Sequence, residues 1–296
     1  MKEIVVISGK GGTGKTSIVA AFAALAKNAV LADCDVDAAD LHLVLEPKVK
    51  QTTDFSGGKK ASIIAEKCIG CGKCQDMCRF DAIHFNGPAN NLIANTFTID
   101  PIACEGCKVC VEFCPVDAIE FSNCINGQWF ISDTRFGPMV HAKLGIAEEN
   151  SGKLVSLIRK EAKKIAEENN KDLIIVDGSP GIGCPVIASI TGADLVLVVT
   201  EPTLSGKHDL DRVSKLTANF GIDTLVCVNK ADINLQITGQ ISEDAPQRRL
   251  KLVGEIPYDE AFTKAQIMKA TLVEYTGGDT TERVKALWRE VVYALG

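Results

Sequence analysis

Short apolar runs rich in valine and isoleucine alternate with longer amphipathic stretches along most of the chain. Each run is apolar throughout, which is typical of parallel strands covered on both faces. The strands are expected at residues 3–8, 29–35, 173–179, 195–200, 224–230 and 251–257. The stretches between them, such as 151–170, have the length and periodicity of helices. This order predicts an α/β fold with a doubly wound, mostly parallel sheet.

The alternation stops between about residues 57 and 130, where the chain contains an internal repeat. The first copy, CIGCGKCQDMCRFDAIHF, begins at Cys68, and the second, CEGCKVCVEFCPVDAIEF, begins at Cys104. Both copies follow the pattern C-x-G-C-x-x-C-x-x-x-C-x-x-D-A-I-x-F. The repeat predicts a small α+β domain at 58–126, inserted into a larger domain that is formed by 1–57 and 127–296.

The net charge and the cysteine content narrow the classes of function. The chain has 296 residues and a formal net charge of −6, so it lacks the basic footprint of a general nucleic-acid binder. It shows no charged-then-apolar leader and no apolar run long enough to cross a membrane. We therefore expect a cytoplasmic protein with no nucleic-acid partner. In that reducing compartment, metal ligation is a better interpretation of the twelve cysteines than disulfides.

The first expected strand leads into SGKGGTGKT, a glycine-rich turn followed by a helix. Glycines let backbone N–H groups approach a phosphate without a Cβ in the way, and the helix adds its positive N-terminal end. Lys15 is expected to reach the β- and γ-phosphates, and the hydroxyl of Thr16 is expected to ligate Mg²⁺. The remaining phosphate-binding residues of the loop are Gly11, Gly12, Thr13, Gly14 and Ser17.

Each repeat contains four cysteines with the C-x2-C-x2-C-x3-C spacing of bacterial ferredoxins. Thiolates are soft ligands that suit iron–sulfur clusters, and zinc sites seldom use interleaved sets of four. In this spacing the fourth cysteine of each run binds the cluster of the other run. One 4Fe-4S cluster is therefore assigned to Cys68, Cys71, Cys74 and Cys114, and a second to Cys104, Cys107, Cys110 and Cys78.

The glycine-rich loop, KGGTGKT, carries a second lysine, Lys10, at its start. This variant resembles the deviant P-loop ATPases, which include the MinD and ParA proteins, the Mrp-type scaffold ATPases and the nitrogenase iron protein. The whole chain resembles MinD-superfamily ATPases with an inserted two-cluster ferredoxin domain. The resemblance implies a homodimer that closes on ATP, with Lys10 crossing to the partner's nucleotide. A cation in that place would neutralise charge that develops on the transferred phosphoryl group.

The same resemblance implies roles for residues at the ends of two further strands. Asp35, in LADCDVDAAD, matches the family's aspartate that orients the attacking water, although Asp33 and Asp37 lie close by. Asp177, in DGSPGIG, would hold Mg²⁺ through water, and the N–H of Gly181 would contact the γ-phosphate. The implied catalytic residues are thus Lys10, Lys15, Asp35 and Asp177.

An N-K-x-D pattern at Asn229, Lys230 and Asp232 leaves two nucleotides to consider. Many GTPases read guanine with this pattern, whereas an asparagine at this place contacts adenine in the deviant P-loop ATPases. The rest of the resemblance favours ATP. Pro257, in GEIPYD, resembles the family's loop on the base side of the nucleotide.

The sequence favours an ATPase whose nucleotide state gates electron transfer through its two clusters to a redox or metallocofactor-assembly protein. Two alternatives stay open: an Mrp-like carrier that delivers clusters or metal to client proteins, and a positioning ATPase of the MinD kind with structural clusters.

Two further features carry both a functional and a packing interpretation. Cys184, just after DGSPGIG, is either a packing residue or a ligand for a bridging metal. MinD binds membrane through a terminal amphipathic helix, but an apolar stripe on such a helix is more often core. The stripe of the last helix here consists of Val284, Leu287, Trp288, Val291 and Leu295.

Overall fold

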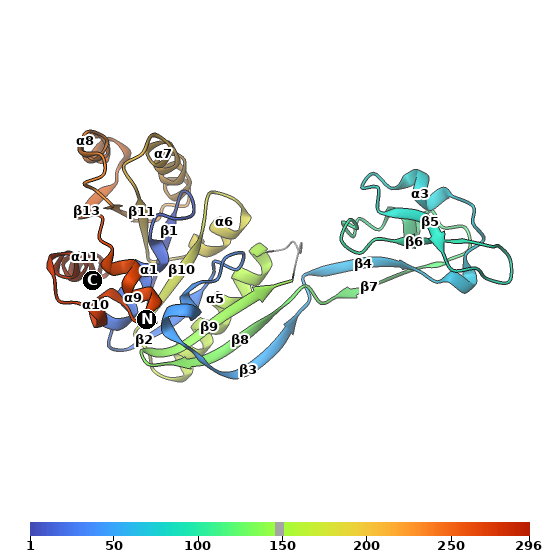
Figure 1. Ribbon diagram of the computed structural model, residues 1–296, viewed down its shortest axis with the longest axis horizontal. Coiled ribbons are helices and arrows are strands. Elements are labelled where there is room, and N and C mark those ends of the chain that lie inside the picture. The colour runs from blue at the N-terminus through green and yellow to red at the C-terminus, as the bar shows by residue number, and fades with distance from the viewer. Residues whose placement is uncertain (146–150) are drawn as a thin grey trace. The chain divides into compact units, whose positions relative to one another are not determined.

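The computed structural model describes residues 1–145 and 151–296, and the chain divides into two compact units (Figure 1). The larger unit consists of Met1–Thr53, Trp129–Lys143 and Ser151–Gly296. The continuous part of the smaller unit is Asp54–Gln128. Each unit has its own buried apolar cluster.

A mostly parallel sheet is the centre of the larger unit, as predicted. Within the described residues it has nine strands, and every neighbouring pair from β13 to β9 is parallel. In spatial order the strands are β13 (Lys251–Ile256), β12 (Thr224–Asn229), β11 (Leu195–Thr200), β1 (Lys2–Ser8), β10 (Leu173–Pro180), β2 (Ala29–Asp33), β9 (Gly137–Leu144), β8 (Gly127–Thr134) and β3 (Lys48–Phe55). Because the central strands are parallel, their carboxyl ends share one edge, where doubly wound sheets bind ligands.

Burial explains why the predicted strands inside the sheet are apolar, whereas β13, at one edge, is mostly partly exposed and contains Lys251 and Glu255. Every residue of β2, β11 and β12 is buried, since helices cover both faces of the central sheet. The three strands that were not predicted, β3, β8 and β9, extend the sheet beyond β2. Most residues of β3 are exposed, which explains its polar sequence, KVKQTTDF.

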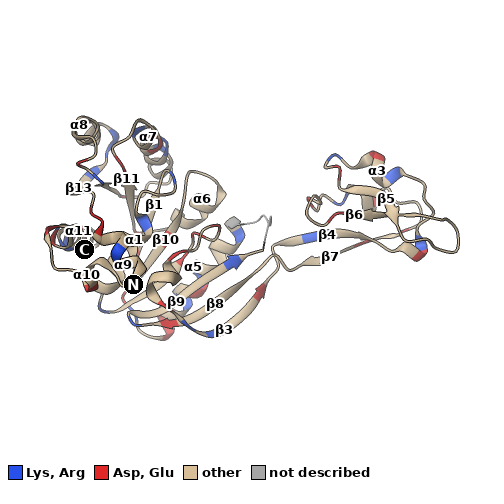
Figure 2. Cartoon of the chain, in the orientation of Figure 1, with Lys and Arg blue, Asp and Glu red and all other residues tan. Residues whose placement is uncertain are grey.

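The helices of the larger unit pack on opposite faces of the sheet. Helices α1, α2 and α11 share one apolar cluster with alternate residues of the strands, whereas α5 and α6 contact β10 on the other face. The helices are α1 (Lys15–Leu25), α2 (Leu41–Leu45), α5 (Ser151–Glu168), α6 (Cys184–Ile190), α7 (Leu204–Asn219), α8 (Leu235–Asp244), α9 (Ala261–Ile267), α10 (Leu272–Tyr275) and α11 (Asp279–Leu295), with a short 3₁₀ turn at Pro246–Arg248. Basic and acidic residues are interspersed along these helices (Figure 2).

The apolar stripe of α11 is core, the interpretation that its sequence favoured. Val284, Leu287, Val291 and Leu295 are buried in the cluster, and the ring of Trp288 lies 4.8 Å from that of Phe22 between centroids. Among the helices that the structure describes, none is long and apolar enough to cross a membrane.

Within residues 54–128, the smaller unit has two antiparallel strand pairs and three short helical turns. Strand β4 (Gly58–Ile63) pairs with β7 (Ile119–Cys124), and β5 (Ile83–Gly87) pairs with β6 (Thr96–Ile99). The helical turns are a 3₁₀ turn at Ala65–Lys67, α3 (Lys73–Met77) and α4 (Val109–Glu112). Its buried cluster is small and includes two of the cysteines, Cys68 and Cys74.

The sequence repeat is also a repeat of backbone conformation. Left-handed φ angles occur in pairs at equivalent positions of the two copies, at Gly70 and Gly106, at Gly72 and Lys108, and at Asp81 and Asp117. L-residues other than glycine adopt these angles rarely, so the pairing is specific. The two cysteine runs therefore have matching folds.

Candidate functional site

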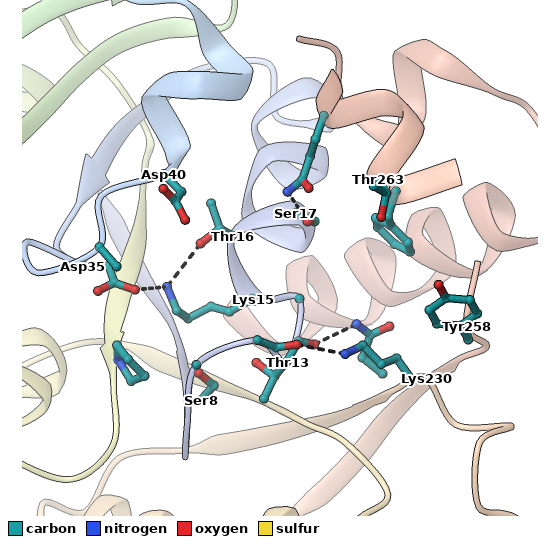
Figure 3. Close-up of a pocket in the computed structure, with 18 of the residues that line it drawn as sticks. Ser8, Thr13, Lys15, Thr16, Ser17, Asp35, Asp40, Lys230, Tyr258 and Thr263 are labelled. Carbon is teal, nitrogen blue, oxygen red and sulfur yellow. Dashed lines mark hydrogen bonds and ion pairs between the residues drawn. The ribbon is translucent and has the colours of Figure 1, made fainter. Parts of the chain in front are cut away.

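A cavity of about 400 Å³ lies at the carboxyl edge of the central strands, a volume in the range of small-molecule sites (Figure 3). The loop of residues 11–17 forms one side of it, together with Ser8 at the end of β1. The other lining residues are Asp35, Ala38, Asp40, Pro180, Asn229, Lys230, Pro257, Tyr258, Asp259, Phe262, Thr263 and Gln266. The predicted nucleotide-binding residues Gly11, Gly12, Thr13, Gly14, Lys15, Thr16, Ser17, Asp35, Asn229 and Pro257 are thus brought to one cavity.

The conformation of the loop requires glycine at two positions. Gly12 and Gly14 have φ angles of 80° and 86°, in the left-handed region. A Cβ at Gly14 would also lie 2.3 Å from Nδ2 of Asn229, which donates a hydrogen bond to the carbonyl of Thr13 at 2.7 Å. Helix α1 begins at Lys15, so its free N–H groups and its dipole lie at the loop, where they favour phosphate.

Lys15 is buried among acidic groups at the base of the cavity. Its Nζ is bonded to the carboxylate of Asp177 and lies 3.3 Å from Oδ2 of Asp35 and 3.5 Å from Oγ1 of Thr16. Burial alone would lower the pKa of Lys15, but the charges of Asp177 and Asp35 outweigh it and raise that pKa. Lys15 is therefore a cation, with the charge that a triphosphate requires.

Four buried polar atoms at this edge of the sheet have no hydrogen-bond partner within the described residues. They are Oγ1 of Thr13, Oδ2 of Asp33, Oδ2 of Asp177 and Oδ1 of Asn229. Unpaired buried polar atoms cost free energy, so several of them together are typical of a site that binds a polar ligand. Carboxylate oxygens beside the hydroxyl of Thr16 suit Mg²⁺, and this donor set fits the predicted ion.

The structure separates the three aspartates that follow β2. Asp33 is fully buried, pairs in register with Asp177, and accepts a hydrogen bond from the N–H of Asp35 at 3.2 Å. Burial and the neighbouring charge of Asp177 raise the pKa of Asp33 well above its usual range. Asp35 lines the cavity and Asp37 is exposed. Of the three, Asp35 is thus the one that lines the cavity, and its main-chain N–H is held by Asp33.

Lys10 directly precedes the lining residue Gly11 but does not itself line the cavity. Its Nζ forms an ion pair with Oε1 of Glu201 at 2.5 Å and donates to Oγ of Ser205 at 3.0 Å. Oε2 of Glu201 lies 3.3 Å from Nζ of Lys230, which also donates to the carbonyl of Gly12 at 2.9 Å. Burial opposes the ionisation of Glu201, but the hydrogen bonds from the two lysines outweigh it and lower its pKa. In this state Lys10 is thus held by its own subunit.

Gly181 stays a predicted contact of the γ-phosphate. Its φ angle is 93°, and its N–H donates to the carbonyl of Ser8 at 2.8 Å. Contact with a phosphate therefore requires this hydrogen bond to break.

The N-K-x-D residues have separate roles in the structure. Asn229 and Lys230 bind the carbonyls of the glycine-rich loop and line the cavity. Oδ1 of Asp232 accepts a hydrogen bond from the N–H of Tyr258 at 2.6 Å, and Asp232 is not among the lining residues. Asp232 therefore supports the loop that carries Pro257.

Sequence reasoning missed the wall of the cavity that α9 provides. Phe262, Thr263 and Gln266 line the cavity, and Nε2 of Gln266 donates to Oγ of Ser17 at 2.9 Å. It also missed Glu201 and Ser205, the two residues that bind the side chain of Lys10. These residues lie far from the loop in sequence, and no local pattern marks them.

The eight cysteines of the repeat line two separate hollows in the smaller unit. Cys68, Cys71, Cys74 and Cys114 line one hollow, and Cys78, Cys104, Cys107 and Cys110 line the other. Each hollow thus receives the fourth cysteine of the opposite run. In the part of the chain that the structure describes, however, no three His, Cys, Asp or Glu side chains are arranged to hold a metal ion.

The cysteine pKa values report the same grouping. Burial, with a smaller contribution from Cys68 and Cys71, raises the pKa of Cys74 to about 11. Burial also raises the pKa of Cys110, and Cys104, Cys107 and Cys78 add to the effect. Neighbouring thiols that oppose each other's ionisation would be stabilised as thiolates by a bound cation.

The cysteines outside the repeat differ in exposure. Cys34 and Cys227 are fully buried, as expected of small core residues. Cys184 is exposed at the first residue of α6, directly after Gly183. The role of Cys184 stays a prediction.

Comparisons with known proteins agree with the fold and the cavity. The CobQ/CobB/MinD/ParA nucleotide binding domain matches residues 4–272. The chain is 35% identical to the uncharacterized protein MJ0578 of Methanocaldococcus jannaschii over 292 residues, 98% of this chain and 96% of that protein. It is 31% identical over 110 residues to the chloroplastic MinD homolog of Arabidopsis thaliana, 36% of this chain and 33% of that protein.

Two solved structures share the fold over nearly the whole chain. The cell division ATPase MinD of Pyrococcus furiosus matches with a TM-score of 0.57 and 16% identity, over 99% of this chain and 98% of that one. The ATP complex of Cyanothece McdA(D38A) matches with a TM-score of 0.55 and 18% identity, over 99% and 96%. The fold, the loop of residues 11–17 and the match over residues 4–272 lead to one conclusion. The chain belongs to the CobQ/CobB/MinD/ParA nucleotide-binding family.

Proposed function

We propose that this protein binds and hydrolyses ATP with Mg²⁺, and that its nucleotide state gates electron transfer through two 4Fe-4S clusters. The electron acceptor would be a redox or metallocofactor-assembly protein. One observation carries the proposal: a chain of a nucleotide-binding family also contains two hollows, each lined by four cysteines with the crossed grouping of a two-cluster ferredoxin.

The base-side contacts support ATP as the nucleotide. Oδ1 of Asn229 is buried without a partner in the described residues, so it is available to accept a hydrogen bond from the amino group of adenine. Asp232 does not line the cavity, and its Oδ1 accepts a hydrogen bond from the N–H of Tyr258. A guanine reader would need Asp232 free and facing the base.

The phosphate-side residues support hydrolysis. Lys15 and the N–H groups of the loop would hold the phosphates. Thr16, and Asp177 through water, would hold Mg²⁺, which would supply charge neutralisation. Asp35 accepts a hydrogen bond from the attacking water and orients it toward the γ-phosphorus. Water attack breaks the bond to the β-phosphate oxygen and yields ADP and phosphate. Lys10, once released from Glu201, neutralises charge on the partner's nucleotide in an ATP-bound homodimer.

The cysteine hollows fit iron–sulfur clusters by donor chemistry. Thiolates are the ligands that such clusters require, and each hollow has four. Clusters bound there would supply one-electron transfer between a low-potential donor protein and the acceptor. The apolar side chains of Ile63, Phe97 and Ile119 also line the first hollow.

A second function, delivery of clusters or metal to client proteins, has one observation in its favour. Cys71 and Cys107, the second cysteine of each run, are exposed. An exposed ligand can be exchanged for a thiolate of another protein. Transfer of iron to an apo-protein without an ATP effect on electron transfer would favour this function.

The test is anaerobic reconstitution with iron and sulfide, followed by iron quantitation and EPR. The wild type is expected to hold about eight irons per chain, and the Cys78→Ala variant is expected to lose or convert the cluster of the second run. The matched control is Cys124→Ala, since Cys124 lines neither hollow. Two intact 4Fe-4S centres in Cys78→Ala would refute the ligand assignment.

A further inference from the structure

We propose that Arg135 is a positioning residue. It links α2 and α9, which form two walls of the nucleotide cavity, to β3 and β8, the strands that lead into and out of the inserted segment of residues 54–128. Through it, occupancy of the cavity is transmitted to β3 and β8. The inference rests on the proposed binding of ATP.

Arg135 lies in the two-residue turn between β8 (Gly127–Thr134) and β9 (Gly137–Leu144). The turn is fixed by Oγ1 of Thr134, which accepts from the N–H of Phe136 at 3.1 Å and donates to the carbonyl of Gly137 at 2.8 Å. The guanidinium lies over the ring of Phe136, 4.7 Å from its centroid. Its direction is therefore set by the turn itself.

The guanidinium makes five hydrogen bonds to three separate segments. Nε and one terminal nitrogen bind the carboxylate of Glu274 in a bidentate pair, at 2.7 and 2.8 Å. The carbonyls of Leu45 and Val44 accept at 3.0 and 3.1 Å, and the carbonyl of Lys269 accepts at 3.2 Å. Bidentate arginine–carboxylate pairs and multiple carbonyl contacts fix geometry more strictly than one ion pair does.

Two of these segments lead directly to the walls of the cavity. Val44 and Leu45 end α2, and Asp40, which precedes that helix, lines the cavity. Lys269 follows α9 (Ala261–Ile267), whose Thr263 and Gln266 line the opposite side. The two helices have five and seven residues, so a shift at the cavity end of either one reaches its other end within two turns.

The five hydrogen bonds of Arg135 form a clamp, and this clamp also holds the chain on both sides of the inserted segment. Strand β3 begins at Lys48, three residues after α2 ends, and carries the chain toward residues 54–128. Strand β8, which ends next to Arg135, carries the chain back. Lys269 adds a second link, because its Nζ donates to Oε1 of Glu46 at 2.6 Å.

Glu274 is held in place independently of Arg135. Its carboxylate accepts from the N–H of Thr271 at 2.8 Å and completes the capping box of α10. The hydrogen bond from Arg135 lowers the pKa of Glu274 to about 2, so the clamp is ionised at neutral pH. A charged, prearranged partner is what a positioning contact needs.

Hydrogen–deuterium exchange, with and without a non-hydrolysable ATP analogue and Mg²⁺, tests the proposal. In the wild type, the nucleotide is expected to slow exchange in the loop of residues 11–17 and also, by about tenfold, in β3 and β8. In Arg135→Gln the loop should still be protected, while the effect on β3 and β8 falls to less than about twofold. The matched control is Arg283→Gln, an arginine on α11 that pairs with Asp279 and is expected to behave as wild type.

The outcomes separate this inference from the proposed function. Absence of protection in the loop of the wild type would refute ATP binding itself. Two results would refute only the role of Arg135, provided that the loop is protected. One is that the nucleotide leaves exchange in β3 and β8 of the wild type unchanged. The other is that it protects these strands equally in Arg135→Gln. Where Arg135→Gln does not fold, Glu274→Gln retains the three carbonyl contacts and should reduce the effect on β3 and β8 by about half.

Discussion

The nucleotide cavity and the cysteine hollows differ in what holds them together. The cavity lies at the edge of a sheet whose central strands are buried from end to end, and its loop is fixed by hydrogen bonds from Asn229 and Lys230. The hollows lie in a unit whose buried apolar cluster is small and includes cysteines as members. Small domains bury too little apolar surface to be stable alone, and metals commonly supply the rest. The comparison indicates that the cavity is preformed, whereas the order of the smaller unit would depend on the proposed clusters.

The largest expected effect is the loss of order in the smaller unit on removal of iron. Anaerobic chelation should raise hydrogen exchange across residues 58–124 toward that of an unfolded chain, because the cluster ligands cross between the two runs. Exchange in β1, β11 and β12 should not change. Protection of β4 and β7 that is the same with and without iron would contradict this view of the smaller unit.

The next effect concerns the state of Lys10 at the nucleotide site. Lys10→Ala should bind ATP with near wild-type affinity but fail to form a dimer, since Lys10 does not itself line the cavity. Glu201→Gln should have the opposite effect and allow dimers at about tenfold lower ATP, because it removes the ion pair that holds Lys10 in its own subunit. Light scattering with Mg-ATP under conditions that block hydrolysis measures both.

Two results would contradict that role for Lys10. One is a Lys10→Ala variant that dimerises and turns over as wild type does. The other is easier dimer formation in Glu201→Gln that persists when Lys10 is also replaced by alanine, because the predicted effect of Glu201→Gln requires Lys10.

A smaller effect should appear in the pH dependence of the larger unit. Burial, with a smaller contribution from His42, lowers the pKa of His141 to about 4, and Nε2 of His141 is 2.9 Å from Oγ of Ser132. His141 is therefore protonated near pH 6.5 in the unfolded chain but only near pH 4 in the folded chain. Stability is full above pH 6.5 and falls as the pH drops toward 4, by about 2 kcal/mol between pH 7 and 5.

Urea unfolding at pH 7 and pH 5 measures this loss. The His141→Gln variant should lose less stability over the same interval, because it has no group that titrates there. A loss as large in His141→Gln as in the wild type would show that other groups cause the pH dependence.

The smallest effect is expected at Asp232, which supports the base loop without lining the cavity. Asp232→Ala should weaken ATP binding by about threefold through loss of the hydrogen bond to Tyr258. Asp232→Asn should retain wild-type affinity, since the amide oxygen still accepts from that N–H. Competition between ATP and GTP should favour ATP in all three proteins. A GTP preference in the wild type that Asp232→Asn abolishes would identify Asp232 as a guanine reader.

Burial decided which elements could be predicted from the sequence. All six predicted strands are present, and five of them, β1, β2, β10, β11 and β12, are largely apolar because they lie inside the sheet with both faces covered. Strand β3 was missed because most of its residues are exposed and polar, and an edge strand needs only hydrogen bonds to its neighbour. The continuous part of the smaller unit, Asp54–Gln128, extends beyond the two repeat copies on both sides. These flanking residues carry no repeat, so the pattern could not fix where the unit begins and ends.

The candidate site was predictable where one short segment supplies both the residues and their geometry. The loop of residues 11–17 and Asp35, which lines the same cavity just after β2, are of this kind. Glu201, Arg135 and the wall formed by α9 were not predictable, since each acts through a partner that is distant in sequence. The fully buried position of Asp33 also follows from its neighbour in the sheet, Asp177, and not from its own segment.

The central claim is that nucleotide at the cavity controls electron transfer at the cysteine hollows. The most direct measurement is the rate at which the iron-loaded, reduced protein passes electrons to a one-electron acceptor dye, followed by EPR with and without Mg-ATP. The account predicts that Mg-ATP changes this rate by at least about fivefold and that the change is lost in Lys10→Ala. Equal rates with and without Mg-ATP, in a protein shown to hold two clusters and to bind ATP, would contradict it.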